Sequence, residues 1–330
     1  MYWKTGRSDA LGILLPAVAA LLISPLASGQ EGHARPIRMI VPFSAGASPD
    51  VMTRIVADTL SRQLGTPVIV ENKAGAGGNI GAEYAARQPG DGHTIFVGST
   101  ANLAVNKTLY AKLPYDPERD FRPVSIAWVT RNVLIVPAGA PYRSVQDVIA
   151  RARAEPGRLT YGSPGPGTAG HLIGELFQTA THTKVTHVPY KGQNQVVTDL
   201  LGGHIDFSFE TIGSALPNIE SGKVRALAIT GADRHPKLPD TPTFSEAGVP
   251  SVDRLQGWAM FAVPASTPPS VVQGVQSELA KVLADEATRG KLTGLGVDLR
   301  ITTPEQTRQF LKEEIEHWGA VVRSAGIRFD

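Results

Sequence analysis

The 330-residue sequence contains no cysteine, no run of like charge and no apolar run of membrane-spanning length. Because cysteine is missing, the chain can form no disulfide and cannot be anchored through a lipid-modified cysteine. Its 32 basic and 30 acidic residues are interspersed and leave a net charge of +2. We therefore expect no nucleic-acid partner, since such a surface needs clustered Lys and Arg. The 42% of apolar residues suffices for the core of one or two globular domains.

The first 29 residues follow the pattern of a secretory signal peptide. Lys4 and Arg7 precede the uncharged, mostly apolar stretch 10–23, and the small residues 27–29 then offer a cleavage site. An N-terminal membrane anchor is the alternative, but the stretch is shorter than the roughly 20 residues that span a membrane. We expect cleavage near Gly29 and a soluble exported protein.

Short β-branched or aromatic runs alternate with helical patterns over the remaining chain. Such alternation predicts an α/β fold with mainly parallel sheets. The predicted strands are Ile37–Val41, Val68–Val70, Thr94–Val97, Val133–Val136, Leu159–Tyr161, Ile205–Phe209, Ala226–Thr230 and Met260–Val263. Two further helices are predicted near the C-terminus, at Ser270–Leu283 and Pro304–Ala325.

A loop of small residues joins the first predicted strand to an amphipathic helix. Ser48 fits an N-cap, and Pro49 fits the first helical position, where its missing N–H costs nothing. Gly65 fits the helix stop. The buried face of this helix follows the helical period and consists of Met52, Ile55, Val56, Thr59, Leu60 and Leu64.

The same strand, loop and helix recur at Leu159–Gln178, where Thr168 can cap the helix. The repetition predicts two lobes built on one plan. We place the chain crossings near 131–137 and 226–231, followed by the Pro-rich connector 236–250. The predicted organisation is a signal peptide at 1–29, lobe 1 at 36–132 plus 232–330, and lobe 2 at 133–231.

The two loops are suited to binding anions. A helix N-terminus presents unpaired N–H groups and about half a positive charge, so it binds an anion without a basic side chain. Small residues let a carboxylate reach the backbone. The alternative is that each loop is only a strand-to-helix connector, and the equivalent position of the two loops argues against it.

Motifs of enzymes and of metal sites are missing. GAGGNIG has Ile80 where a dinucleotide fingerprint needs glycine, and no phosphate-binding loop is present. Tyr161 replaces the first glycine of a nucleophile elbow. His171, His182 and His187 lack metal-ligand spacing, and only His171 is expected at a loop edge. We expect no catalytic residue, no metal and no cofactor, hence no enzyme; a hydrolase or isomerase on this scaffold would need a nucleophile–base pair.

Several segments stand together in the order of a known family. They are VPFSAGASPD, VIVENKAGAGGNIGAEYAA, PGDGHTIFVGS, LYAKLPYDPERDFRPVS, YGSPGPGTAGHL, HVPYKG and VRALAITG. The sequence resembles the Bug family, the extracytoplasmic solute receptors of tripartite tricarboxylate transporters, from Ile37 to the C-terminal helix. The resemblance implies a periplasmic, monomeric, two-lobed binding protein of the type II-like class with a hinge. It implies one small carboxylate ligand per cleft and membrane permease subunits as partners.

The resemblance also implies a set of ligand-binding residues. The first loop supplies Phe43, Ser44, Ala45, Gly46, Ala47, Ser48 and Asp50, and the second supplies Ser163, Gly165, Gly167, Thr168 and His171. Asn79, Ser99 and Thr100 would line the first lobe, and Asp206 the second. The family's first loop usually reads Ala-Gly-Gly, so Ala47 is a departure that would be strained if the position needs a positive φ.

Two questions stay open at this point. Glu210 follows the predicted strand Ile205–Phe209. Either it faces the ligand site, where its negative charge would favour an amine-bearing ligand, or it lies on the surface. The exported receptor could also serve as a ligand-sensing accessory of a signalling protein, because domain closure presents a surface to either kind of partner.

Overall fold

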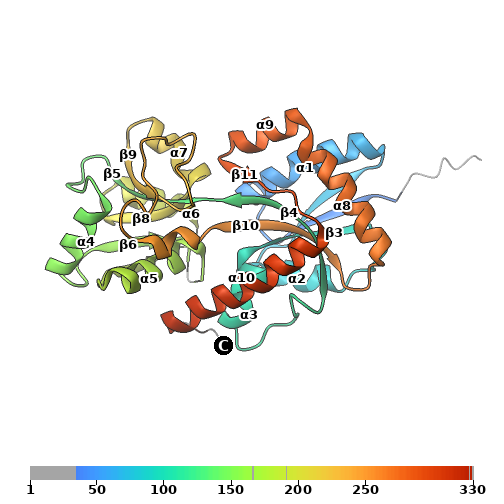
Figure 1. The fold of residues 1–330 in the computed structure, drawn as a ribbon, viewed down its shortest axis with the longest axis horizontal. Coiled ribbons are helices and arrows are strands. Elements are labelled where there is room, and N and C mark those ends of the chain that lie inside the picture. Colours follow the sequence, from blue (N-terminus) through green and yellow to red (C-terminus); the bar gives the residue numbers. More distant parts are fainter. Residues whose placement is uncertain (1–34, 166, 191, 327, 329–330) are drawn as a thin grey trace, which may run out of the picture. The chain divides into compact units, whose positions relative to one another are not determined.

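The computed structural model describes residues 35–165, 167–190, 192–326 and 328. The predicted signal peptide, residues 1–29, therefore lies outside the described residues. Residues 35–330 form one compact unit, which contains two β-sheets with helices packed on them (Figure 1).

The described strands form a six-stranded and a five-stranded sheet. The order is β11-β4-β10-β3-β1-β2 in the first sheet and β7-β6-β8-β5-β9 in the second. The first sheet consists of β1 (Ile37–Val41), β2 (Val68–Asn72), β3 (Thr94–Ser99), β4 (Phe121–Thr130), β10 (Gly257–Pro264) and β11 (Val297–Leu299). The second consists of β5 (Asn132–Pro137), β6 (Thr160–Ser163), β7 (Thr186–Pro189), β8 (Phe207–Thr211) and β9 (Val224–Ile229).

The helices follow the same division along the chain. Those joined to strands of the first sheet are α1 (Ser48–Leu64), α2 (Asn79–Ala86), α3 (Asn106–Leu109), α8 (Pro269–Ala284), α9 (Glu286–Gly294) and α10 (Pro304–Ala325). Those joined to the second are α4 (Val145–Ala154), α5 (Ala169–Thr181), α6 (Gln193–Leu201) and α7 (Ile212–Glu220). Short helical turns are η1 (Ala76–Gly78), η2 (Ala101–Val105) and η3 (Pro250–Arg254).

Both sheets contain the same arrangement of strands. β1 pairs in parallel with β2 and β3, and β6 pairs in parallel with β7 and β8. In each sheet an antiparallel strand follows, β10 beside β3 and β5 beside β8. The expectation of mainly parallel sheets is thus correct for the strands around β1 and β6 and wrong for the antiparallel strands β4, β10 and β11 and β5 and β9. The chain runs directly from β4 into β5 and from η3 into β10. A parallel pair requires a helical crossover connection, which these two strands do not have.

Alternating side chains give each sheet two buried faces. Met39 and Val41 pack towards α1 and α8, whereas Ile40, on the opposite face, belongs to a cluster with residues of α2 and α10. That second cluster also contains Tyr161 and Phe207 of the second sheet, so one apolar core is common to both sheets. Helix α10 contributes to it and contacts β4, α3 and α5.

One arginine joins the two chain crossings. Arg131 stands between β4 and β5, and its side chain is only 10% exposed. Its Nε lies 2.7 Å from Asp298 Oδ2 in β11, and its Nη1 lies 3.0 Å from Asp233 Oδ1 beyond β9. The junction is therefore held to both sheets by charge-assisted hydrogen bonds.

Candidate functional site

The two small-residue loops lie at corresponding places in the two sheets. From β1 the chain first forms β2 on one side and then β3 on the other, and β6, β7 and β8 follow the same course. Ligands of open α/β sheets bind outside the carboxyl ends of the strands where the order reverses in this way. Loop 1 (residues 42–47) leaves the carboxyl end of β1, and loop 2 (residues 164, 165, 167 and 168 of those described) leaves that of β6.

Loop 1 is shaped by Gly46 and Asp50. Gly46 has φ 81°, a conformation that favours glycine, and its N–H donates to Asp50 Oδ2 at 2.8 Å. Asp50 is 2% exposed and also accepts from Arg54 Nε at 3.0 Å and Asn72 Nδ2 at 2.8 Å. Burial by itself would raise the pKa of the Asp50 carboxyl, but these hydrogen bonds outweigh it, so the pKa lies below its usual value.

Two expectations for loop 1 need correction. Ala47 has φ −69° and ψ 154°, so it is unstrained and its difference from the family's usual glycine does not alter the backbone path. Ala47, rather than Ser48, is the N-cap residue, and helix α1 begins at Ser48. Ser44, Ala45, Gly46 and Ser48 are exposed, as a ligand-binding loop requires.

Loop 2 repeats this geometry. Gly167 has φ 77°, and its N–H donates to His171 Nδ1 at 3.0 Å. Thr168 has φ −72° and ψ 159° at the N-cap, and α5 begins at Ala169. The Thr168 hydroxyl donates to the Gly165 carbonyl at 2.7 Å, so it closes the turn instead of capping the helix as predicted.

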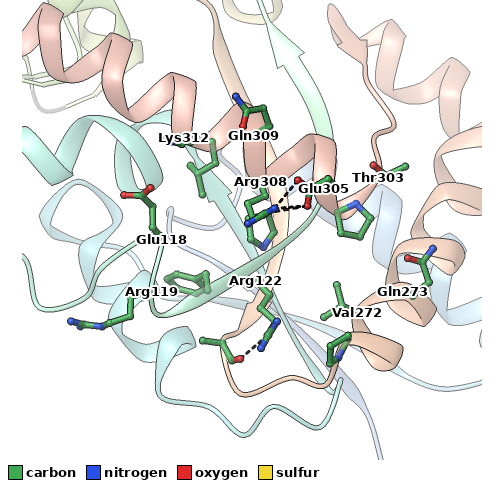
Figure 2. A pocket seen from close by; sticks show the side chains of 16 residues that line it. Glu118, Arg119, Arg122, Val272, Gln273, Thr303, Glu305, Arg308, Gln309 and Lys312 are labelled. Atoms are coloured by element: carbon green, nitrogen blue, oxygen red, sulfur yellow. Dashed lines mark hydrogen bonds and ion pairs between the residues drawn. The ribbon is translucent and has the colours of Figure 1, made fainter.

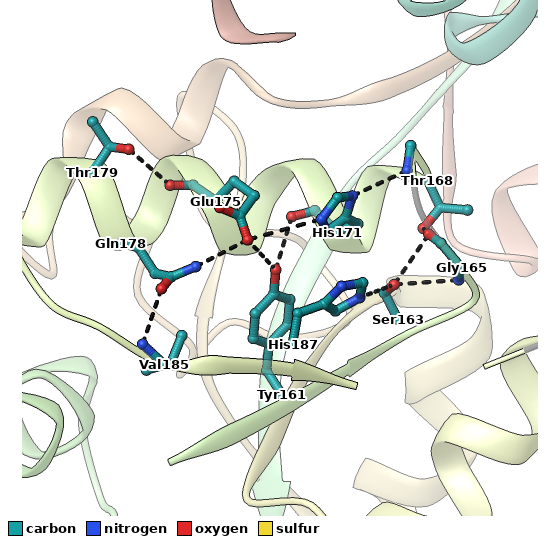
Figure 3. A network of polar contacts seen from close by, with 11 residues as sticks. Tyr161, Ser163, Gly165, Thr168, His171, Glu175, Gln178, Thr179, Val185 and His187 are labelled. Carbon is teal, nitrogen blue, oxygen red and sulfur yellow. Dashed lines mark hydrogen bonds and ion pairs between the residues drawn. The ribbon is translucent and has the colours of Figure 1, made fainter. Parts of the chain in front are cut away.

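A network of polar side chains from β6, β7 and α5 contacts loop 2 (Figure 3). Ser163 Oγ lies 2.7 Å from His187 Nε2, and the His187 ring stacks on His171 at 4.2 Å. Tyr161 stacks on the other side of His187 and donates from its hydroxyl to Glu175 Oε1 at 2.8 Å. Burial, and then the neighbouring His171, lower the pKa of His187 to about 4, so this ring is neutral at pH 7.

His187 lies within strand β7 and not at a loop edge, but its imidazole reaches Ser163 immediately before loop 2, a contact that the sequence did not indicate. The parallel register of β6 and β7 pairs Tyr161 with His187 and so brings the imidazole to Ser163. The resulting serine–histidine pair is not a nucleophile that substrate can reach, because Ser163 is fully buried and its Oγ also bonds the Gly165 carbonyl at 3.1 Å.

Three side chains predicted to line the first lobe are engaged within the protein. Asn79 Oδ1 accepts from Asn106 Nδ2 at 2.6 Å and from the Tyr115 hydroxyl at 3.0 Å. Ser99 Oγ accepts from Asn102 Nδ2 at 2.8 Å, and Thr100 Oγ1 accepts from the Trp258 N–H at 2.8 Å. These residues stand near the carboxyl end of β3 and organise it.

Asp206, predicted to line the second lobe's part of the ligand site, lies away from loop 2. Its Oδ2 accepts from the Thr160 N–H at 2.8 Å and from the Thr160 hydroxyl at 2.9 Å. Thr160 begins β6, whereas loop 2 follows Ser163 at the other end of this strand. Since a strand rises about 3.3 Å per residue, Asp206 lies at the opposite end of the strands from loop 2, where it holds the start of β6.

Glu210 is the acidic group that does lie at the carboxyl end of β8. It is fully buried, so the surface position considered for it is excluded. Its Oε2 accepts from Ser214 Oγ at 2.9 Å and bonds Gln193, and its Oε1 accepts from Ser208 Oγ at 3.0 Å. Ser208 and Glu210 alternate with Phe207 and Phe209 along β8, and this pattern of two polar side chains on one face was the available signal.

One cavity among the described residues lies elsewhere. It measures about 900 Å³ and is bounded by the starts of β4, α8 and α10 (Figure 2). None of the predicted ligand residues lines it. Its charged groups are largely satisfied, since Arg308 pairs with Glu305 and Arg122 Nε donates to the Ala265 carbonyl. We regard the strand-end loops as the better candidate site, because they combine helix N-termini with a topological reversal.

Comparison with known proteins identifies the family. Residues 52–327 match the sequence model described as "Tripartite tricarboxylate transporter family receptor". The chain belongs to this receptor family. Protein BugT of Bordetella pertussis is 37% identical over 312 residues, covering 94% of this chain and 95% of BugT. A protein from Pseudomonas sp. strain P51, encoded between tcbD and tcbE, is 38% identical over 289 residues, covering 87% and 85% of the two chains.

Solved structures of similar receptors share the fold. Rpa4515 of R. palustris, determined with adipate, has a TM-score of 0.82 and 34% identity, covering 89% of this chain and 98% of its own. MatC of Rhodopseudomonas palustris, with bound malate, has a TM-score of 0.76 and 29% identity over 88% and 99% of the chains. The two-lobed α/β fold of a periplasmic solute-binding receptor is thereby confirmed.

No helix in the described part combines the length and the apolar character needed to cross a membrane.

Proposed function

We propose that this receptor captures a small carboxylate between loop 1 and loop 2 and delivers it to the membrane permease of a tripartite tricarboxylate transporter. The observation that carries the proposal is the repeated loop geometry at the carboxyl ends of β1 and β6. Similar receptors bind adipate and malate, and both ligands carry two carboxylates. Loss of adipate or malate uptake in a strain lacking the receptor would support the transport role.

The backbone groups proposed to hold the ligand are the first N–H groups of α1 and α5. The N–H groups of Gly46 and Gly167 are already bonded to side chains, so the donors are those of Ser48 in α1 and of Ala169 and Gly170 in α5. These groups have no partner within an α-helix. We further propose that the mature chain acts in the periplasm without catalysis, after removal of the signal near Gly29, which the intact mass of the exported protein tests.

Ligand binding should stabilise the folded protein. A dicarboxylate at 100 times its Kd is expected to raise the free energy of unfolding by about 2.7 kcal/mol. The measurement is a thermal shift with adipate, malate and, for comparison, hexanoate and adipamide. The matched variants are Gly46→Ala and Gly139→Ala, because a Cβ meets nothing within 4 Å at either place and only Gly46 has a positive φ.

We expect Gly46→Ala to weaken binding at least tenfold, since about 1–2 kcal/mol of backbone strain would shift loop 1. Gly139→Ala should bind as the wild type does. Lys312→Ala tests the cavity of Figure 2: a loss of affinity in this variant, with none in Gly46→Ala, would place the ligand there and overturn the proposed site.

A further inference from the structure

The hydrogen bonds that shape loop 1 and loop 2 correspond position by position. In loop 1 the Ala47 N–H donates to the Ser44 carbonyl at 3.2 Å, and in loop 2 the Thr168 N–H donates to the Gly165 carbonyl at 3.3 Å. One residue earlier stands the positive-φ glycine, Gly46 or Gly167. The helical bonds that follow are also equivalent, with 3.0 Å from the fourth helical N–H to the N-cap carbonyl in both.

Asp50 and His171 occupy the same place in this pattern. Each stands four residues after the glycine, is buried, and accepts that glycine's N–H, at 2.8 Å for Asp50 and 3.0 Å for His171. Each is in turn faced by the residue one turn further on. Arg54 Nη2 lies 3.0 Å from Asp50 Oδ1, and Glu175 Oε1 lies 3.8 Å from His171 Nε2.

The supporting strands correspond as well. Asn72 ends β2 and donates to Asp50, and His187 in β7 stacks on His171. β2 and β7 are the equivalent neighbours of β1 and β6 in their sheets. The geometry is therefore common to both lobes, but the chemistry of the acceptor differs: an ionised acid faced by Arg54 in loop 1, and a neutral imidazole faced by Glu175 in loop 2.

We propose that Asp50 and His171 are positioning residues that set the shape of the two ligand loops through Gly46 and Gly167 and do not themselves touch the ligand. This inference deepens the proposed function and rests on it. It revises the resemblance-based assignment of both side chains as ligand contacts, because Asp50 Oδ2 and His171 Nδ1 are bonded to the loop backbone. The helix N–H groups beyond each glycine are left for the ligand.

Protonation at low pH affects the two positioning residues differently. A protonated His171 has no acceptor at Nδ1, so it releases the Gly167 N–H. Burial lowers the pKa of His171, and the nearby Glu175 opposes this. The other titratable groups facing His171 are His187, which stacks on it, and Tyr161, whose hydroxyl bonds the His171 carbonyl. Asp50 accepts the Gly46 N–H while its carboxyl is ionised. Because its pKa is lowered, it stays ionised to a lower pH than an ordinary aspartate.

The test compares substitutions that keep or remove the acceptor. His171→Asn places an amide oxygen near the position of Nδ1 and does not titrate, whereas His171→Leu has no acceptor. Asp50→Asn and Asp50→Leu form the equivalent pair. His204→Asn, on an exposed histidine, is the matched control.

The first readout needs no ligand. Amide hydrogen exchange of Gly167 in the free protein should be at least tenfold faster in His171→Leu than in the wild type, and restored in His171→Asn. Gly46 should respond to the Asp50 pair in the same way. This readout keeps the inference separate from the proposed function: unchanged exchange overturns the positioning role, even if carboxylates bind, and the exchange result stands even if no tested carboxylate binds.

The second readout is adipate affinity against pH. The wild type and His204→Asn should lose affinity at a pH below 6.5, because His171 becomes protonated as the pH falls through its lowered pKa. His171→Asn should retain affinity within threefold at pH 7.5 and lose the part of the pH dependence that comes from the imidazole, so that only the protonation of adipate itself remains. His171→Leu should bind at least tenfold more weakly at pH 7.5. Equal losses in His171→Asn and His171→Leu would instead show that the imidazole contacts the ligand, and would overturn the proposal.

Discussion

Replacing Glu210 with glutamine should raise the free energy of unfolding at pH 8 by about 3 kcal/mol and leave it unchanged near pH 4. The side chain is fully buried. Burial raises the pKa of its carboxyl from 4.5 to about 7, although hydrogen bonds from Ser214 and Ser208 oppose the shift. Glutamine has the same size. Its amide oxygen can accept from one of the two serine hydroxyls and its NH2 can donate to the other, and it carries no charge that must be buried.

The sign follows from proton binding. Between pH 4.5 and 7 the native protein holds a proton on Glu210 that the unfolded chain has lost. The free energy of unfolding of the wild type therefore falls as the pH rises through this window, and the deficit is complete above pH 7. Glu210→Gln removes this contribution, so the difference between variant and wild type should grow over the same window.

Urea unfolding at pH 4, 5, 6, 7 and 8 measures this difference. Glu220→Gln makes the same change on an exposed residue of α7 and should give a flat difference near zero. A Glu210→Gln variant that is destabilised equally at every pH would contradict the prediction, because the carboxylate would then be stabilised by its three partners rather than penalised by burial.

Replacing Tyr161 with alanine should lower the free energy of unfolding by about 3–5 kcal/mol. The side chain is fully buried and its ring stacks on His187 at 4.8 Å and on Phe207 at 5.8 Å. Gly174 leaves the space for the ring, since a Cβ there would stand 2.2 Å from it. Neighbours so closely packed cannot fill the resulting cavity without moving the β-strands.

Tyr161→Phe is the matched variant, because it removes only the hydroxyl that donates to Glu175. We expect a loss of about 1 kcal/mol, the usual value of one hydrogen bond. Denaturant unfolding followed by tryptophan fluorescence and by circular dichroism measures both variants. A loss below 1 kcal/mol in Tyr161→Ala would show that the aromatic cluster is not an important source of stability.

The sequence was most informative where a pattern was long. Helix α10 was predicted at its observed bounds, Pro304–Ala325, and β1 at Ile37–Val41. Strands β4, β7 and β11 were missed. β11 has only three residues, and β7 is mostly exposed or half-buried, so neither shows the alternation that marks a strand. β4 is buried on both faces over most of its length, which hides its period of two.

The candidate site was predictable as backbone but not as side chains. Small residues between a strand and a helix indicated both loops, because glycine and helix N-termini act locally. Which polar side chain bonds which atom depends on the register between strands. The pairing of β6 with β7 brings His187 to Ser163, and the start of β6 holds Asp206. No local pattern reports such contacts.

The position of Arg131 has a mechanical consequence. Because its guanidinium bonds carboxylates on opposite sides of the chain junction, sliding of one sheet past the other would lengthen both bonds. A displacement of either carboxylate from the junction has to break an ion pair of Arg131, so relative movement of the two sheets is restrained at this residue.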